Sequence, residues 1–360
     1  MTKSTIFIVA SGTGGHIFPA LAVADFLQQQ YNIVWIGTGN KIEKKHVTYK
    51  LQQLPITGFR KKNILHKIIV IKNLFQALKK SNQLIKQYQP IKILSFGGYV
   101  SIPMGLMAKA NNIPLIIHEQ NAIPGLSNKI LHFISLKTLT AYPQVLKSTK
   151  THLVGNPLRK EFNPQFIKSN YSNQFSNTNL QHNNKDKINI LIIGGSLGAK
   201  YFNNNLPTIL QKIDHIASVI HQTGYNNNIR EIEEKYHKLQ PRFRFKVVNF
   251  LADIVAEYKN SDLIICRAGA LTVTEITCIG RPAIFIPFPY AVDNHQFYNA
   301  KFLEQANLGF IVNQDKNINT NLTNILQHLS KNQCELIINN YNCRHNNLYC
   351  LNNIVKLVAG

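Results

Sequence analysis

The feature that most constrains the fold of this chain is a unit that occurs twice: an apolar run, a glycine-rich turn and a helix-like segment. The first apolar run is 6–10 and enters the turn 11–16, and the second is 188–193 and enters the turn 194–199. Continuous apolar runs are typical of parallel strands that are covered on both faces. Two such openings in 360 residues predict an α/β protein with two doubly wound domains.

Further apolar runs alternate with helix-length segments or loops, as Rossmann-like domains require; they are 33–36, 91–95, 115–118, 217–220, 245–248, 263–266 and 283–286. A helix is expected from Pro19, which suits a helix start because it lacks an N–H. We predict a first domain at 1–160 and a second at 188–339. The Asn- and Ser-rich segment 161–187 is expected to be a linker or surface excursion. A helix at about 340–360 is expected and can pack back on the first domain.

The charge of the chain is strongly positive and unevenly placed. Forty Lys and Arg residues against seventeen Asp and Glu give a formal net charge of +23, and no acidic residue lies between Glu43 and Glu119. Such a charge indicates nucleic acid, anionic lipid or phosphorylated substrates as partners. The abundance of Lys with Asn and Ile, as in AT-rich coding sequences, is an alternative source of part of it. The basic stretch has few aromatic residues for base stacking, so nucleic acid is not expected as a partner.

The cysteines and the apolar segments indicate in which cellular compartment the chain resides. The five cysteines are an odd number without a CxxC pair, which disfavours a disulfide framework or a zinc site and fits a reducing cytosol. The apolar run at 6–10 is too short for a signal-peptide core. No segment approaches the ~20 apolar residues that span a bilayer. Any membrane contact is therefore expected to be peripheral.

The glycine turns predict anion sites. Backbone N–H groups and the positive end of a helix dipole meet where a strand passes into a helix. The turn 11–16 does not have the GxGxxG spacing, and 37–39 holds no acid for a ribose, so nicotinamide binding is disfavoured. The turn 194–198 is a second glycine turn between a predicted strand and a helix. The segment 97–101 is a third glycine turn, after another predicted strand. Together they predict one phosphate-rich cleft between two facing domains.

The segment 266–275 is dense in motif residues and places Glu275 early in a helix. Its carboxylate could accept hydrogen bonds from a ribose diol. The alternative is a carboxylate near a helix N-terminus, a common feature that contributes only ~0.3–1 kcal/mol.

Several separated motifs agree with one family in order and spacing: 12–16 with 18–20, 97–101, 118–121, 155–159, 194–199, 267–275 and 293–296. On these residues the chain resembles the MurG family, whose members convert lipid I to lipid II with UDP-N-acetylglucosamine. The resemblance implies two facing Rossmann-like domains of the GT-B type, an inverting transfer, and a peripheral place at the cytoplasmic side of the bacterial inner membrane. A related transferase that glycosylates another lipid, such as a diacylglycerol, remains an alternative.

The resemblance also implies a binding site for UDP-N-acetylglucosamine, formed by Thr13, Gly14, Gly15, Asn121, Arg159, Ser196, Leu251, Ala270, Leu271, Thr272, Val273, Thr274, Glu275 and Gln296. Glu275 would bind the ribose, Ser196 and Arg159 the diphosphate, and Leu251 the uracil through its backbone. Ser11 and His295 depart from the family's frequent residues. No cofactor is implied, and without an Asp-x-Asp pair no metal is expected.

The reaction needs a base for the acceptor hydroxyl. His16 is favoured by its reference pKa and its place in the first glycine turn, and Glu119 is the alternative. Arg159 and the helix after Gly198 would stabilise the leaving diphosphate. The acceptor is expected to be lipid I.

Apolar and basic residues interleave with helical spacing over 64–86, and the lysines of this stripe are Lys67, Lys72, Lys79, Lys80 and Lys86. One interpretation is a surface that rests on anionic lipid. The other is a stripe that packs on the sheet beneath solvated lysines. The missing acids favour the lipid.

Overall fold

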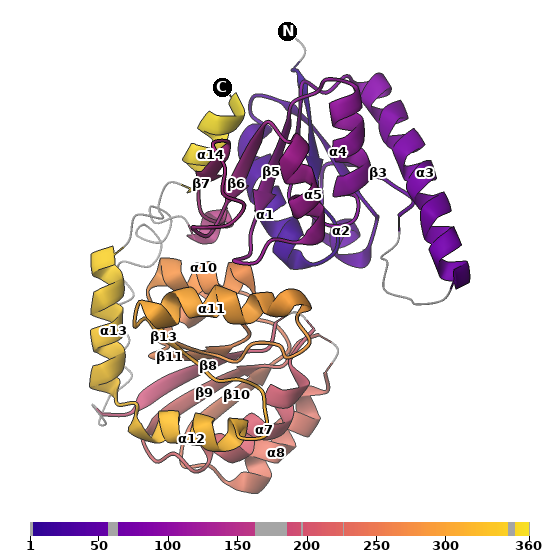
Figure 1. Ribbon diagram of the computed structural model, residues 1–360. Coiled ribbons are helices and arrows are strands. Elements are labelled where there is room, and N and C mark those ends of the chain that lie inside the picture. The colour runs from indigo at the N-terminus through magenta and orange to yellow at the C-terminus, as the bar shows by residue number, and fades with distance from the viewer. Residues whose placement is uncertain are drawn as a thin grey trace. The chain divides into compact units, whose positions relative to one another are not determined.

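The computed structural model describes residues 3–56, 64–162, 186–195, 197–225, 227–344 and 350–359. The chain divides into two compact units (Figure 1): unit 1 is Met1–Lys160 with Tyr349–Gly360, and unit 2 is Glu161–Leu348. Each unit is built on one parallel sheet flanked by helices, so the predicted class, two α/β domains, is confirmed. Most of the expected linker at 161–187 and the predicted site residue Ser196 lie outside the described residues.

Strands and helices alternate through unit 1, which contains β1 (Thr5–Val9), α1 (Gly14–Leu27), β2 (Asn32–Gly37), α2 (Lys41–His46), β3 (Lys50–Gln53), α3 (Ile64–Tyr88), β4 (Lys92–Ser95), α4 (Ser101–Ala110), β5 (Leu115–Glu119), α5 (Leu126–Ile134), β6 (Lys137–Thr140), β7 (Thr151–Leu153) and α14 (Cys350–Ala359). The seven strands have the order β3-β2-β1-β4-β5-β6-β7. All of their pairings are parallel.

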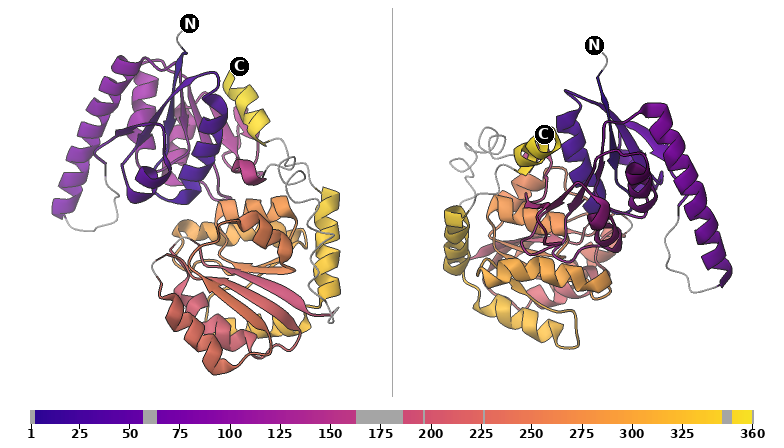
Figure 2. Two further views of the ribbon diagram at one scale, coloured as in Figure 1. Left: turned by 180° about the vertical axis from the view of Figure 1, so that it is seen from behind. Right: turned by 45° about the horizontal axis from the view of Figure 1, so that its top comes forward.

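Two apolar layers cover the sheet of unit 1, because successive side chains of a strand point to opposite faces. On one face Ile6 and Ile8 pack with α1 and with Ile354 of α14. On the other face Phe7 and Val9 pack with α3, α4 and α5. Figures 1 and 2 accordingly show α14 beside α1, with α3 on the other side of the sheet.

Two lysines hold the end of α14. Lys137 Nζ donates to the carbonyl of Leu357 at 2.8 Å, and Lys92 Nζ donates to that of Val358. Positive groups at the carboxyl end of a helix satisfy its last carbonyls and its dipole.

The same alternation occurs in unit 2, which contains the short η1 (Lys160–Phe162) at its start, β8 (Ile188–Ile193), α7 (Lys200–Leu210), β9 (Ile216–Gln222), α8 (Ile229–Leu239), β10 (Arg244–Val248), α9 (Ile254–Asn260), β11 (Leu263–Cys266), α10 (Ala270–Ile279), β12 (Ala283–Phe285), η2 (Val292–Asn294), α11 (His295–Gln305), β13 (Gly309–Ile311), α12 (Ile318–His328) and α13 (Lys331–Arg344). The strand order is β10-β9-β8-β11-β12-β13, again with parallel pairings. Ile190 and Ile192 of β8 pack with α7, α8 and α12 in one buried cluster.

Two expectations about helices differ from the structure. The helix expected from Pro19 begins at Gly14 instead, so Pro19 lies inside α1. This prediction was wrong because the glycine turn itself bends into the first helical turn, and a single proline then removes only one backbone hydrogen bond. The expected helix at about 340–360 is two helices, and the second of them, α14, packs in unit 1.

Candidate functional site

In unit 1 the predicted site residues follow the carboxyl ends of strands. β1 and β4 are neighbours in the sheet although they are not consecutive in the chain. Open α/β sheets bind ligands at such a switch point. The turn 11–16 follows β1, and the turn 97–98 follows β4. The sheet therefore brings two of the predicted glycine turns to one place.

His16 lies where these two turns meet. Its Nδ1 is 3.0 Å from the carbonyl oxygen of Ser11. Because a carbonyl only accepts, Nδ1 carries the proton and Nε2 is the basic nitrogen of the neutral ring. A Cβ on Gly97 would lie 3.2 Å from Nε2, and Gly97 has φ +102°. Glycine at 97 thus lets the second turn pass close to the basic edge of the imidazole.

The predicted residues Thr13, Gly14 and Gly15 form the start of α1. Thr13 is the extended N-cap residue, and its carbonyl accepts from the N–H groups of His16 (3.1 Å) and Ile17 (3.3 Å). Its side chain makes no capping hydrogen bond. The positive end of a 14-residue helix therefore lies directly at the turn, which suits an anion.

Glu119 ends β5 and is only 2% exposed. Its Oε1 accepts from the backbone N–H (3.0 Å) and side-chain Nδ2 (3.3 Å) of Asn121. Its Oε2 accepts from the N–H of Gly125 (3.0 Å) and from Asn128 Nδ2 (2.8 Å). The carboxylate therefore shapes the loop 121–125 and positions Asn121.

Arg159 belongs to a cluster of basic and aromatic groups in unit 1. Its guanidinium carbon lies 5.8 Å from the centre of the Phe18 ring, and His46 meets the same ring edge-on at 5.3 Å. Burial lowers the pKa of His46, and the charges of Lys45 and Arg159 lower it further. Positive charge therefore gathers one helical turn from Gly14, at a place that suits a phosphate.

Sequence reasoning missed the residues that shape the loop after β2. Glu43 is fully buried and accepts from the N–H groups of Thr38 (2.8 Å) and Gly39 (2.6 Å). Asn40 caps α2 and donates to the carbonyl of Gly12 (3.2 Å), which links this loop to the first turn. The signal was present, since a capping residue followed three positions later by Glu marks a helix start.

Unit 2 repeats the arrangement around β8 and β11, the neighbouring strands at its switch point. Gly195 and Gly198 follow β8 with φ values of +81° and +76°. A Cβ on Gly198 would lie 1.9 Å from the carbonyl oxygen of Thr223, so glycine is required for this close approach. The 11-residue helix α7 starts directly afterwards, at Lys200.

The predicted residues from Ala270 to Glu275 are the first six of α10, which starts after the N-cap Gly269. Glu275 lies beyond the first turn of α10, which contains no acidic residue, and its ribose role stays a prediction. Glu275 is 9% exposed, and Tyr258 Oη donates to its Oε2 at 3.3 Å. A fixed, largely buried carboxylate is suited to a diol ligand.

Leu251 and Gln296 follow other strands of the same sheet. Leu251 is buried between β10 and α9. Gln296 is in the first turn of α11, and its Oε1 accepts from the N–H of Phe288 at 2.9 Å. The unusual His295 lies beside the carbonyl of Val292, 2.8 Å from its Nδ1. All described site residues of unit 2 thus follow the carboxyl ends of its strands.

The motif residue Arg267 has a structural role within unit 2. Its Nη1 donates to the carbonyls of Ile286 (2.9 Å) and Pro287 (3.1 Å), and its Nη2 donates to Gln314 Oε1 (2.7 Å). Burial lowers its pKa to about 10. Arg267 therefore fixes the segment after β12 that leads to Gln296.

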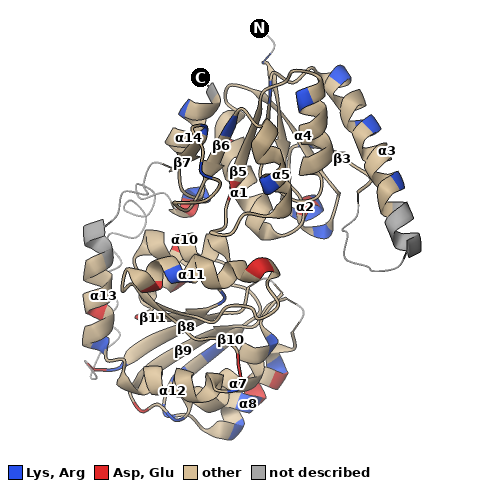
Figure 3. Ribbon diagram, viewed as in Figure 1, with Lys and Arg blue, Asp and Glu red and all other residues tan. Residues whose placement is uncertain are grey.

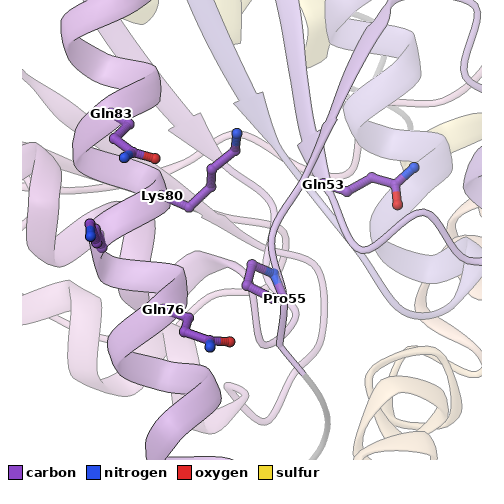
Figure 4. Close-up of a pocket in the computed structure, with 6 residues that line it drawn as sticks. Gln53, Pro55, Gln76, Lys80 and Gln83 are labelled. Carbon is purple, nitrogen blue, oxygen red and sulfur yellow. The ribbon is translucent and has the colours of Figure 1, made fainter.

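A groove of about 400 Å³ lies elsewhere, beside α3, and contains none of the predicted site residues. Figure 4 shows its lining: Gln76, Lys80 and Gln83 from α3, facing Gln53 and Pro55. In the part of the chain that the structure describes, no three His, Cys, Asp or Glu side chains come together to form a metal site. The absence of a metal requirement stays a prediction.

The glycine turns and the two sheets correspond to a known family. The N-terminal domain of glycosyltransferase family 28 matches residues 6–140, and its C-terminal domain matches residues 189–349. The chain belongs to glycosyltransferase family 28. It is accordingly a sugar transferase, as the motifs predicted.

Family 28 relatives agree over almost the whole chain. A UDP-N-acetylglucosamine–N-acetylmuramyl-(pentapeptide) pyrophosphoryl-undecaprenol N-acetylglucosamine transferase of Shewanella piezotolerans is 35% identical over 93% of this chain and 90% of its own. The enzyme of the same name from Shewanella woodyi is 36% identical with the same coverage. The crystal structure of Acinetobacter baumannii MurG has a TM-score of 0.78 at 31% identity and covers 99% of both chains. The resemblance to the MurG family is confirmed.

More distant solved structures show the fold alone. A UDP-glucosyltransferase from Polygonum tinctorium has a TM-score of 0.70 at 12% identity and covers 99% of both chains. At that identity the comparison carries no information on substrates.

Proposed function

We propose that this chain transfers N-acetylglucosamine from UDP-N-acetylglucosamine to the muramic acid of undecaprenyl-pyrophosphoryl-N-acetylmuramyl-pentapeptide (lipid I), with inversion, to form lipid II. The observation that carries the proposal is the match to the relatives named for this transfer. At 35% identity it extends over 93% of this chain and 90% of the relative. A match of that length includes both units, and therefore both sets of glycine turns.

In the proposed reaction His16 is the base. The acceptor hydroxyl oxygen attacks the anomeric carbon, the bond from that carbon to the UDP oxygen breaks, and the hydroxyl proton passes to His16 Nε2. The contact of Nδ1 with the Ser11 carbonyl fixes the tautomer in which Nε2 is basic. This contact also stabilises the imidazolium that forms, because Nδ1–H remains a donor.

Glu119 is less suited to that role. Its two carboxylate oxygens accept hydrogen bonds from Asn121, Gly125 and Asn128. Both oxygens are therefore already engaged by donors of the protein, and neither is left to accept the proton of a substrate hydroxyl. We therefore propose that Glu119 acts through Asn121, whose placement it controls.

The donor is assigned to unit 2. Glu275 would bind the ribose diol, Leu251 the uracil through its backbone, and the turn 194–198 with the start of α7 the diphosphate. Arg159 and Ser196 would add charge and a hydroxyl to the diphosphate. The N-terminal half, 1–160, would then take the acceptor and face the membrane.

A peripheral place at the cytoplasmic side of the inner membrane fits the surface of unit 1. Figure 3 shows Lys and Arg along α3 and no acidic residue. Ile71 and Phe75 of this helix are 55% and 68% exposed, whereas Leu84 and Ile85 pack against the sheet. Val70 and Ala77, beside these exposed residues, are buried. One face of α3 therefore packs on the sheet while Ile71 and Phe75 point to solvent, so each interpretation of the stripe holds for part of the helix. Exposed apolar residues among lysines suit an anionic bilayer surface.

The helix α5, on the same sheet face as α3, also exposes an apolar side chain in a region with almost no acidic residues. Phe133 of α5, whose helix covers the same sheet face, is 82% exposed. Glu119, which is buried, is the sole acidic residue of the sequence between Glu43 and Glu161. Within the described residues no helix is long and apolar enough to cross a bilayer.

The proposal is tested by transfer of labelled N-acetylglucosamine from its UDP donor to a lipid I analogue, with and without a chelator. We expect transfer in both conditions and none to a diacylglycerol acceptor. Transfer to diacylglycerol alone would assign the chain to the rival lipid. Loss of activity in the chelator, restored by a divalent ion, would contradict metal independence only.

A further inference from the structure

Side-chain amides hold the glycine turn that follows β8. Gln222 Nε2 donates to the carbonyls of Gly195 (3.1 Å) and Asn249 (3.2 Å). Asn227 Nδ2 donates to the carbonyl of Leu197 (3.2 Å). The N–H of Gly198 also donates to the carbonyl of Gly195 (3.0 Å), so this carbonyl accepts both from Gly198 and from Gln222.

The support beneath this turn is the segment 223–224, which touches it backbone to backbone. A Cβ on Gly224, with φ +90°, would lie 2.2 Å from the nitrogen of Gly198. Asn249 Nδ2 donates to the carbonyls of Gly224 and Asn227, both at 3.0 Å. Asn227 in turn donates to the carbonyl of Thr223 (2.7 Å). The three carboxamides therefore form one connected clamp of Gln222, Asn227 and Asn249.

A buried relay fixes the clamp from the core side. Asn203 Nδ2 donates to the carbonyl of Thr223 (3.3 Å), and its Oδ1 lies 3.1 Å from His221 Nε2. His221 Nδ1 lies 3.1 Å from Tyr236 Oη. Because Asn203 Oδ1 only accepts, His221 Nε2 carries the proton, and the tyrosine hydroxyl donates to Nδ1.

We propose that Gln222, Asn227 and Asn249 are positioning residues for the donor's diphosphate, an inference that rests on the proposed function. They act through the backbone carbonyls of Gly195 and Leu197, which follow β8. The carbonyl oxygens of Gly195 and Leu197 are the negative ends of their peptide dipoles. Because they accept hydrogen bonds from side-chain amides, they are directed at the protein and not at the phosphate. Gly198 and the start of α7 then present an electropositive face to a phosphate. Carbonyls that the protein holds before the ligand binds spare it the cost of reorienting them.

The test compares two ligands that differ in the diphosphate. UDP binding is measured by calorimetry, and uridine binding by its competition with UDP. For Asn227→Ala and for Gln222→Met we expect the Kd for UDP to rise about tenfold, as the loss of one or two backbone contacts implies. The Kd for uridine should stay unchanged, because uridine has no phosphate to meet the turn.

The matched control lies on the same strand, β9. Ser218 Oγ donates to Asn189 Oδ1 (2.6 Å) near the amino ends of β8 and β9, away from the glycine turn. Ser218→Ala should lose comparable stability in thermal unfolding and bind both ligands as the wild type does. A general loosening of unit 2 would weaken UDP and uridine alike in all three variants.

The outcomes separate the two proposals. If wild type binds UDP and the clamp variants keep its preference for UDP over uridine, the positioning role is wrong and the proposed function stands. If wild type does not bind UDP, the proposed function falls and this inference falls with it.

Discussion

His16 and His118 of unit 1 lie in contrasting surroundings. His16 is partly exposed at the first glycine turn, whereas His118 is 2% exposed within β5. Burial lowers the pKa of His118 to about 4, although a hydrogen bond to the Gly155 carbonyl (2.9 Å) opposes the shift. His118 therefore stays neutral near pH 7 and holds Gly155, whereas His16 is the residue that we propose as the base.

Replacement of His16 by Ala tests this assignment. We expect kcat to fall by ~10²–10⁴, the contribution of a general base, while the Kd for UDP changes little. Single-turnover assays with the lipid I analogue and UDP calorimetry measure the two quantities. Near-normal turnover would transfer the role of base to another group and leave the anion site at α1 intact.

Replacement of Glu275 by Gln tests the ribose site. The change keeps the shape and removes charge-assisted hydrogen bonds of ~1.5–3 kcal/mol. The KM for UDP-N-acetylglucosamine should therefore rise by about 10- to 100-fold. Thr277→Ala is the control on the same helix, since its Oγ1 only donates to the carbonyl of Val273 (2.7 Å). An unchanged KM in the Gln variant would rule out the ribose role.

The buried His118 predicts how the stability of unit 1 depends on pH. Its pKa of about 4 lies below the ordinary value of 6.5, so the unfolded chain binds the proton first as pH falls. The free energy of unfolding should therefore decrease between about pH 6.5 and 4, by up to ~1.4 kcal/mol per pH unit. Trp35, the single Trp of the sequence, is fully buried in unit 1, so its fluorescence in urea reports this unit.

His118→Gln is the comparison for that experiment. Gln does not titrate, so the variant should lose less stability than wild type between pH 7 and pH 5, even if it is weaker at both. Equal pH dependence in the two proteins would show that other groups carry the effect.

At the scale of elements, strands that contain an apolar run were predicted well, whereas a short polar strand was missed. The runs at 6–10 and 188–193 are β1 and β8 within one residue. β3 (Lys50–Gln53) was not predicted, because it lies at the sheet edge and none of its residues is fully buried. A strand that needs no apolar side chains leaves no periodic signal.

The helix α3 yields a prediction about the membrane. Replacing Lys72, Lys79 and Lys80 with Gln should weaken binding to anionic vesicles by a few kcal/mol at low salt, at ~1 kcal/mol per lysine. Activity on a soluble, short-chain acceptor should be spared. Co-sedimentation with liposomes of graded anionic content measures the binding.

Phe75→Ser is a useful companion because Phe75 is 68% exposed, so its loss leaves the core intact. It should weaken vesicle binding at any salt concentration, whereas the lysine variant should match wild type at high salt. If both variants bind as wild type does, α3 is not the anchor.

At the scale of the whole molecule, the sequence predicted the two sheets, and its motifs supplied site residues that stay predictions. It did not predict the side-chain network that supports the turn after β8. The clamp residues Gln222, Asn227 and Asn249 belong to no motif used for the resemblance. Asn and Gln are also frequent throughout this sequence. The sequence alone therefore does not distinguish a side-chain amide that supports a turn from one that is exposed to solvent. Their partners are backbone groups of distant residues, which only the fold brings together.

The placement of α14 has a consequence for biosynthesis. Ile354 and Val358 are fully buried in the core of unit 1, yet the whole of unit 2 precedes them in the chain. At ~5–20 residues per second on the ribosome, unit 1 waits roughly ten seconds or more for its last helix. During that time the apolar surface that α14 covers is open, so a nascent chain is a natural client for chaperones. Unit 1 is thus synthesised first, but its fold is completed only after unit 2 has been synthesised.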